Sequence, residues 1–131
     1  MLNDQSSLYA DATGQGSVVA AQMAAQDYME ANPNSKLKIE ITFADHQNKP
    51  DIGANIARQW FEREGVDMIL DVPNSSVALA VSGVARQLNK VMVNGSAGTD
   101  KPGTATAEVT GGPSHQGLDK SRPFALVRFQ V

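Results

Sequence analysis

The hydrophobic positions between residues 37 and 98 follow two periods that alternate along the chain. In some segments apolar residues recur at every second position, and in others at every third or fourth position. A period of two is typical of a strand and a period of 3.6 is typical of a helix. Strands and helices that alternate in this way predict an α/β fold, Rossmann-like, with a mostly parallel sheet flanked by helices. Sheets of this kind bind small molecules at the carboxyl ends of their strands.

Three strands are predicted in this region. Residues 37–44 carry apolar side chains at alternate positions, which indicates a strand with one face buried more deeply than the other. Residues 66–72 form a short apolar run that fits a buried parallel strand and stops at Pro73. Residues 90–93 form the third strand, which is followed by a turn rich in small and polar residues.

Three helices are predicted as well, while the first dozen residues are predicted to be a loop. The first helix spans residues 14–32, and the second begins at Pro50, which suits a first helical turn. The third begins at Ser75 and Ser76, which we expect to cap it. Trp60 and Phe61 are expected to pack the second helix against the sheet. The core-facing residues expected for the first helix are Val18, Ala21, Ala25, Tyr28 and Met29.

Composition narrows the functional classes. The chain has 131 residues, a net charge of -3, 5% aromatic residues and scattered Lys and Arg, which argues against a nucleic-acid partner. No apolar run approaches the ~18 residues of a membrane-spanning helix, and no signal segment precedes Leu2. The absence of Cys excludes disulfides and thiol catalysis.

Three separated motifs resemble the amino-terminal lobe of periplasmic solute-binding proteins of ABC importers, in the leucine/isoleucine/valine-binding family. They are LNDQSSLYAD at residues 2–11, ADHQNKP at 44–50 and DVPNSSVALA at 71–80, and the similarity covers about residues 2–100. The resemblance implies an incomplete lobe of a type I periplasmic binding protein. It further implies a fragment of the substrate-binding component of an importer for amino acids or related small carboxylates. Such a protein is no enzyme, needs no cofactor, is periplasmic when intact, and docks on an ABC permease.

The same resemblance implies which residues meet the ligand. They belong to the loops that follow three strands, and Tyr9 in the first of these loops would cover the ligand. Hydroxyl and backbone N–H groups at a helix N-terminus suit a carboxylate, which supports the two serines independently. The expected ligand-binding residues are Tyr9, Asn74, Ser75, Ser76, Ser96, Ala97, Gly98 and Thr99.

The chain departs from the family pattern at both ends. The resemblance places the family's first strand before Leu2, so we expect the chain to begin in the loop after that strand. Residues 1–100 are then a partial ligand-binding lobe, and residues 101–131 are an unmatched tail. Our hypothesis for the tail is a frame-shifted segment with one candidate strand at residues 124–131.

Other interpretations stay open. Ser75 and Ser76 serve as an ordinary helix cap in the simplest interpretation. Residues 14–17 resemble a phosphate-binding loop, which would suit a nucleotide-binding enzyme fragment, although the later part of that motif is absent. A ligand-sensing protein or an inert α/β fragment are further alternatives. His46 and His115 lack the spacing of metal ligands, and we expect no metal site.

Overall fold

Short strands and longer helices alternate along the chain in a computed structural model, which describes residues 1–94 and Ala97. The elements are β1 (Leu2–Asn3), α1 (Ala10–Thr13), α2 (Gln15–Ala31), β2 (Ala44–Asp45), α3 (Pro50–Arg63), β3 (Met68–Leu70), α4 (Ser75–Gln87) and β4 (Val91–Val93).

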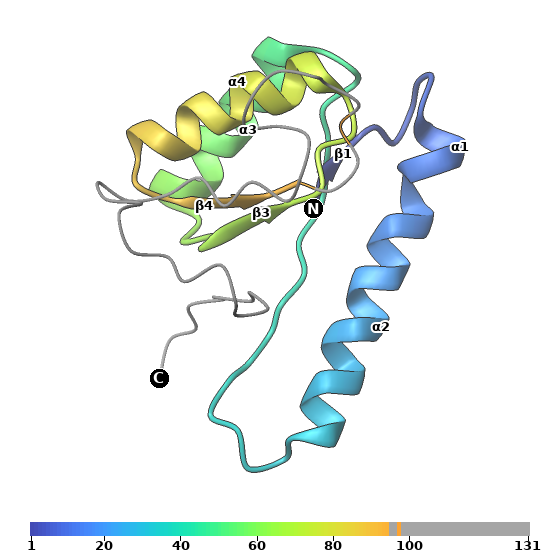
Figure 1. Cartoon of the computed structure of the whole chain (residues 1–131), viewed down its shortest axis with the longest axis vertical. Helices are drawn as coiled ribbons and strands as arrows, with labels where there is room; N and C mark the ends of the chain where they lie inside the picture. The colour runs from blue at the N-terminus through green and yellow to red at the C-terminus, as the bar shows by residue number, and fades with distance from the viewer. Residues whose placement is uncertain (95–96, 98–131) are drawn as a thin grey trace, which may run out of the picture.

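The strands form two parallel pairs. In one pair β1 lies beside β2 with Leu2 opposite Ala44, and in the other β3 lies beside β4 with Ile69 opposite Met92. Figure 1 shows α3 and α4 side by side over one face of the β3–β4 pair, whereas α2 runs away from it. The predicted α/β class with parallel strands is therefore confirmed.

The core lies where α3 and α4 meet the strands. Trp60 and Phe61 of α3 are buried there, which confirms their predicted packing role. Gly53 permits the close approach of the helices, because a Cβ atom at this position would lie 2.5 Å from Cγ1 of Val77. The other members of this core include Leu2, Ala57, Ile69, Val72, Val77, Ala78, Val81, Val84, Ala85 and Met92.

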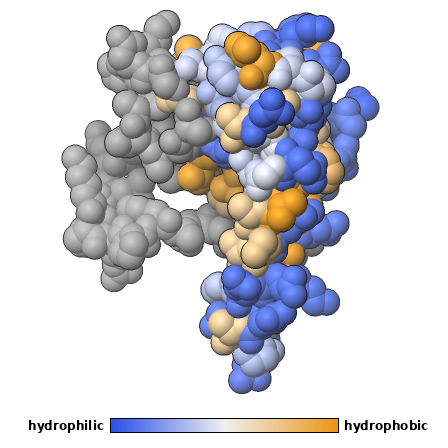
Figure 2. All heavy atoms as spheres, turned by 90° about the vertical axis from the view of Figure 1, so that its right-hand side faces the viewer, coloured by the Kyte–Doolittle hydropathy of each residue, from blue (hydrophilic) through white to orange (hydrophobic). Residues whose placement is uncertain are grey.

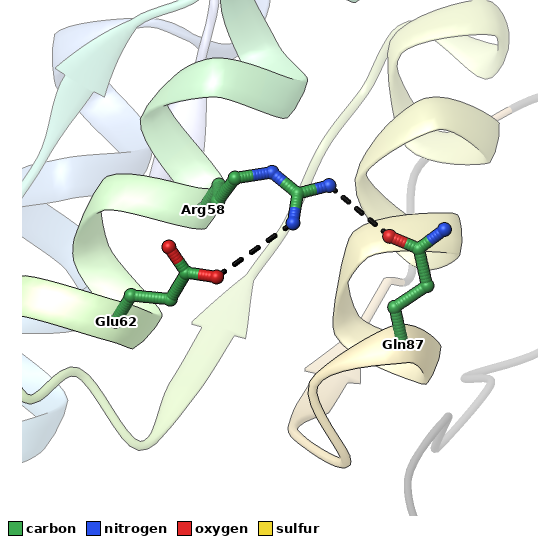
Figure 3. Close-up of polar contacts among 3 residues, drawn as sticks. All are labelled: Arg58, Glu62 and Gln87. Carbon is green, nitrogen blue, oxygen red and sulfur yellow. Dashed lines mark hydrogen bonds and ion pairs between the residues drawn. The ribbon is translucent and has the colours of Figure 1, made fainter.

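A polar contact joins α3 to α4 outside this core (Figure 3). Arg58 donates a hydrogen bond to Oε1 of Gln87 at 3.1 Å, and its other terminal nitrogen lies 3.7 Å from a carboxylate oxygen of Glu62. These side chains are exposed to solvent, so the contact lies on the surface of the two packed helices and outside their apolar interior.

The prediction of a loop over the first dozen residues is confirmed for residues 4–9 and wrong on either side of them, where β1 and α1 lie. β1 is a strand through its pairing with β2: the Ala44 N–H donates to the Met1 carbonyl at 3.2 Å, and the His46 N–H donates to the Asn3 carbonyl at 3.1 Å. Two paired residues are too few to show a period of two, and their pairing partner lies about forty residues away. The sequence pattern near the start therefore could not reveal the strand.

The prediction of a strand over residues 37–44 is also wrong for most of its length. Only Ala44–Asp45 is a strand, since β1 offers partners to these two residues alone among the described ones. Leu37, Ile39 and Ile41 are nevertheless half-buried while the residues between them are exposed. The alternating apolar residues thus predict correctly that these three residues are partly buried. A strand, however, also needs hydrogen bonds to a neighbouring backbone.

The predicted helices are confirmed with small changes of boundary. The helix expected at residues 14–32 is α2, and the helices expected from Pro50 and from residue 75 are α3 and α4. In α2, Val18 and Ala25 are buried as expected, whereas Tyr28 and Met29 are exposed. The strands expected at 66–72 and 90–93 are the shorter β3 and β4. The candidate strand at 124–131 and the rest of the tail lie outside the described residues.

Candidate functional site

Hydrogen bonds connect the loops that follow the strands. We call these segments the strand-end loops: residues 4–9 after β1, residues 46–49 after β2, residues 71–74 after β3, and Asn94 after β4. Three of their residues have a positive φ, namely Gln47 at 50°, Asn48 at 59° and Asp71 at 53°. The left-handed conformation turns the chain sharply away from the strand direction just after β2 and β3.

The loop after β1 is organised by the buried carboxylate of Asp4. This carboxylate accepts hydrogen bonds from the N–H groups of Ser7 at 3.0 Å and Tyr9 at 2.8 Å, and from the Ser7 hydroxyl at 2.6 Å. Burial raises the pKa of the Asp4 carboxyl, but the hydrogen bonds from Ser7, Tyr9 and Ser6 outweigh it, so the pKa lies below its ordinary value. Asp4 is therefore ionised and fixes the conformation of the loop that carries Tyr9.

A second carboxylate, Asp45, joins the loops after β1 and β2. It accepts from the backbone N–H groups of Gln5 at 3.1 Å and Gln47 at 2.7 Å, and from the Ser6 hydroxyl. Burial and the nearby charge of Asp4 raise the pKa of Asp45, yet these hydrogen bonds hold it below its ordinary value. The two acidic side chains thus have their oxygens engaged in holding neighbouring loops together.

His46 follows Asp45 and is fully buried. Its Nδ1 accepts a hydrogen bond from the Asn48 N–H at 3.0 Å, so the proton of the neutral ring is on Nε2. Burial lowers the pKa of His46, and the charges of Asp4 and Asp45 only partly oppose this effect. Nε2 has no hydrogen-bond partner among the described residues. His46 is therefore a neutral, buried ring in the loop after β2.

The loop after β3 leads into α4 through Asn74. The Asn74 side-chain oxygen accepts from the Val77 N–H at 3.0 Å and from the Ser76 hydroxyl at 2.6 Å. Asn74 is therefore the N-cap, and the prediction that Ser75 and Ser76 cap the helix is wrong. Because Asn74 already has the extended backbone of an N-cap, the serines fall in the first helical turn.

This capping leaves the first backbone donors of α4 available. Within the described part of the chain, the N–H groups of Ser75 and Ser76 have no hydrogen-bond partner. Unpaired N–H groups and the helix dipole make the N-terminus of α4 suitable for an anion such as a carboxylate. Ser75 is half-buried and Ser76 is exposed, so both can be reached from this edge.

The β3–β4 pair is held at the same end by Asn94. Its side-chain oxygen accepts from the Val72 N–H at 3.0 Å, and the Asp71 N–H donates to the Val93 carbonyl at 2.9 Å. The Asn94 side-chain nitrogen is buried without a partner among the described residues. This asparagine therefore joins the end of β4 to the loop after β3.

The structure brings some of the expected ligand-binding residues together. Asn74, Ser75 and Ser76 form one group at the N-terminus of α4, as the adjacent positions require. Tyr9 is exposed at the end of the β1 loop, and none of its hydrogen bonds among the described residues reaches α4. Ala97 is half-buried and packs against the core. The other three expected residues, Ser96, Gly98 and Thr99, lie outside the described residues.

Sequence reasoning missed the residues that hold this edge together. Asp4, Asn48 and Asn94 were not considered, and Asp45 and His46 were given no role in the site. The signal available was their position, since each lies in or just after a short strand of a parallel pair. Among the described residues no group of three or more side chains could hold a metal ion, and no helix there is long and apolar enough to cross a membrane.

Comparison with protein families and solved structures gives one consistent result. A family model described as "Periplasmic binding protein" matches residues 1–120. A periplasmic binding protein from Burkholderia mallei is 42% identical with a TM-score of 0.68, over 76% of this chain and 26% of that one. A branched-chain amino acid ABC transporter periplasmic ligand-binding protein from Burkholderia xenovorans is 40% identical with a TM-score of 0.69. The match covers 78% of this chain and 27% of that one.

More distant structures share the fold. A branched-chain amino acid transporter substrate-binding protein from Streptococcus pneumoniae, in complex with isoleucine, has a TM-score of 0.59 at 20% identity, over 76% of this chain and 28% of that one. Comparison with curated proteins finds no match. The chain spans about a quarter of the length of the solved structures that it matches.

Proposed function

The chain belongs to the periplasmic binding protein family, and from this premise we propose that it supplies one wall of a site for the carboxylate of an amino acid or a related small acid. The observation that carries the proposal is the N-terminus of α4. There Asn74 caps the helix, while the N–H groups of Ser75 and Ser76 have no partner among the described residues. An anionic group placed there would gain two charge-assisted hydrogen bonds and the favourable dipole of the helix.

The full receptor needs more than this wall. The chain matches about a quarter of its structural relatives, so in this proposal a second lobe completes the cleft and the closed receptor docks on an ABC permease in the periplasm. Tyr9, Ser96, Ala97, Gly98 and Thr99 complete the contacts of the present lobe. Residues 1–100 are the part-lobe, and residues 101–131 remain a tail that we propose to be frame-shifted.

Branched-chain amino acids are the proposed ligand class. A relative that is 40% identical carries a name from a branched-chain amino acid transporter, and a more distant relative was solved with isoleucine. Because one wall of a cleft buries only part of a ligand, the affinity of this chain alone is expected to be weak. The proposed role is binding without catalysis.

A nucleotide-binding enzyme finds no support at the glycines of residues 14–17. Gly14 is buried at the junction of α1 and α2, where a Cβ atom would clash with the carbonyl oxygen of Ala10 and lie 3.0 Å from that of Asp4. This close backbone contact is a sufficient reason for glycine at position 14. Gly16 lies in open space, with nothing within 4 Å of a Cβ atom there.

The test is a titration of the isotopically labelled chain with L-isoleucine, followed by NMR. The amide signals of Ser75 and Ser76 should shift in a saturable way, with a dissociation constant in the millimolar range typical of weak sites. L-isoleucinamide serves as the matched control, because it keeps the side chain and the amino group but lacks the carboxylate. Equal shifts with both compounds, or no shift with either, would contradict the proposal.

A further inference from the structure

Asn48 occupies an unusual place between two strand-end loops. It lies in the loop after β2 in the left-handed conformation, with a φ of 59°, directly after Gln47, whose φ is 50°. Two consecutive non-glycine residues in this conformation cost free energy, and asparagine tolerates it better than most residues. A strained pair of this kind requires surrounding contacts that hold it.

Two hydrogen bonds hold Asn48. Its backbone N–H donates to Nδ1 of the buried His46 at 3.0 Å, and its side-chain oxygen accepts from Nδ2 of Asn74 at 2.6 Å. His46 is itself held in place, since it is fully buried and its backbone N–H donates to the Asn3 carbonyl at 3.1 Å. The backbone of Asn48 is therefore anchored in the packed interior, while its side chain reaches the loop that begins α4.

The contact with Asn74 determines how the side-chain amide of Asn74 is oriented at the start of α4. An asparagine amide is planar, so a hydrogen bond from its nitrogen fixes the side on which its oxygen lies. With Nδ2 held by Asn48, the Asn74 oxygen faces α4 and accepts from the Val77 N–H and the Ser76 hydroxyl. Without Asn48 the amide can turn over, and a nitrogen that faces the Val77 N–H could not accept its proton.

We propose that Asn48 is a positioning residue for the N-terminus of α4, acting through Asn74 to keep the first turn of that helix ready for a ligand carboxylate. This inference rests on the proposed function, because it assumes that the ligand binds at Ser75 and Ser76. His46, Asn48 and Asn74 form a chain of contacts from the interior below α3 to the first turn of α4. The loop after β2 thereby affects binding without touching the ligand.

Asn48→Gly is the variant that tests the proposal. Glycine adopts a positive φ at no steric cost, so this change removes the side-chain acceptor while leaving the backbone conformation possible. Asn48→Asp is the conservative variant, because it keeps an oxygen for Asn74 and tolerates the same φ. Asn89→Gly is the matched control, since Asn89 has a φ of 53° in the turn after α4, away from its N-terminus.

Hydrogen exchange of the Val77 amide in the ligand-free chain reports the cap directly. We expect Asn48→Gly to speed this exchange about fivefold, in line with the loss of one hydrogen bond, while Asn48→Asp and Asn89→Gly stay within about twofold of the starting chain. Melting temperatures measured alongside separate a local change at α4 from a general loss of stability. Unchanged exchange at Val77 in Asn48→Gly would overturn the positioning role, whatever the ligand does.

The L-isoleucine titration then separates this inference from the proposed function. If Asn48→Gly weakens binding about fivefold while Asn89→Gly leaves it unchanged, the positioning role is supported in full. If exchange at Val77 responds but the starting chain shows no saturable shift with L-isoleucine, the proposed function is wrong and positioning for that ligand is overturned with it. If Asn89→Gly weakens binding as much as Asn48→Gly, the effect is general destabilisation, which also overturns the positioning role.

Discussion

The half of the described chain that contains α3, β3, α4 and β4 differs sharply from the arm made by α2 and residues 32–43. In the α3–β4 region two helices cover a parallel strand pair and share a buried core. By contrast, α2 has 17 residues and buries only Val18 and Ala25. Figure 2, which views the side where α2 lies, shows hydrophobic and hydrophilic residues interspersed on its surface. The large apolar residues that are exposed on the arm are Val19, Met23, Tyr28, Met29 and Phe43.

The comparison shows that a hydrophobic pattern in the sequence can predict a helix without predicting how much of that helix is buried. Both regions form helices at the places that the sequence indicates, but α3 and α4 bury a continuous apolar face, whereas α2 buries only Val18 and Ala25. Helix stability in proteins comes mainly from the packing of an apolar face. We therefore expect substitutions in the α3–β4 region to change the free energy of unfolding, and substitutions of exposed residues in the arm to change it little.

The largest difference between the two regions is expected when one aromatic side chain is removed from each. Trp60→Ala in α3 should lower the free energy of unfolding by about 3–5 kcal/mol, because the buried ring leaves a cavity. Tyr28→Ala in α2 should change it by less than about 0.5 kcal/mol, since that ring is exposed. Urea unfolding followed by far-UV circular dichroism measures both. Similar losses in the two variants would mean that the arm is part of the cooperative core.

A smaller effect is expected when glycines gain a methyl group. Gly53→Ala should cost about 1–3 kcal/mol, because its Cβ atom would lie 2.5 Å from the Val77 side chain and push α3 and α4 apart. Gly83→Ala in α4 and Gly16→Ala in α2 have open space and should instead gain up to about 1 kcal/mol. Thermal melts of the three variants check this. A gain for Gly53→Ala would show that the two helices can move apart freely.

Near neutrality two groups should set the dependence of stability on pH: the N-terminal amine of Met1, whose pKa burial lowers from 8.0 to about 6, and His46. In the unfolded chain His46 titrates near its ordinary pKa of 6.5, whereas burial lowers its pKa in the folded state. Below pH 6.5 the unfolded state therefore binds more protons, and the free energy of unfolding falls as the pH decreases, by at most about 1.4 kcal/mol per pH unit for this group. Above pH 6.5 the ring is neutral in both states and contributes no slope.

Urea unfolding at pH 7.5, 6.5 and 5.5 measures this slope. Asp4 and Asp45 act in a different window, because their folded-state pKa values lie below the ordinary 3.8 and their contribution is lost only in stronger acid. His115→Gln is the control that removes the other histidine of the chain. The slope between pH 6.5 and 5.5 that survives in His115→Gln and is reduced in His46→Gln belongs to His46, and a slope there that His46→Gln leaves unchanged would contradict the prediction.

The sequence predicted the helices of both regions but not the edge that holds the site. α3 and α4 were found because an apolar stripe continues over several turns, which is a local signal. β1 was missed and residues 37–43 were assigned to a strand, because pairing depends on backbones that are far apart in the sequence. Within the site, Ser75 and Ser76 were located correctly on the helix, while the cap was assigned one residue too late.

The residues that organise the site were missed for a related reason. Asp4, His46 and Asn48 are polar residues in short loops, where sequence patterns usually indicate only a turn. Their roles come from contacts across loops: Asn48 meets Asn74 at a separation of 26 residues, and Asp45 meets Gln5 at a separation of 40. A rule that examines every polar residue directly after a predicted strand would have included Asp45 and His46, but not Asp4, because β1 gives no pattern in the sequence.

The smallest expected effect is at the surface contact of the packed helices. Arg58→Ala removes both its hydrogen bond to Gln87 and its ion pair with Glu62 (Figure 3), yet the Arg58 and Glu62 side chains are each 46% exposed. Water competes for such groups and ordering two long side chains costs entropy, so the free energy of unfolding should change by less than about 0.5 kcal/mol. Urea unfolding of Arg58→Ala, Gln87→Ala and the double variant gives their coupling energy. A coupling above about 1.5 kcal/mol would mean that polar contacts at the helix surface help to hold α3 on α4, whereas a coupling near zero assigns the stability of this region to its apolar interior.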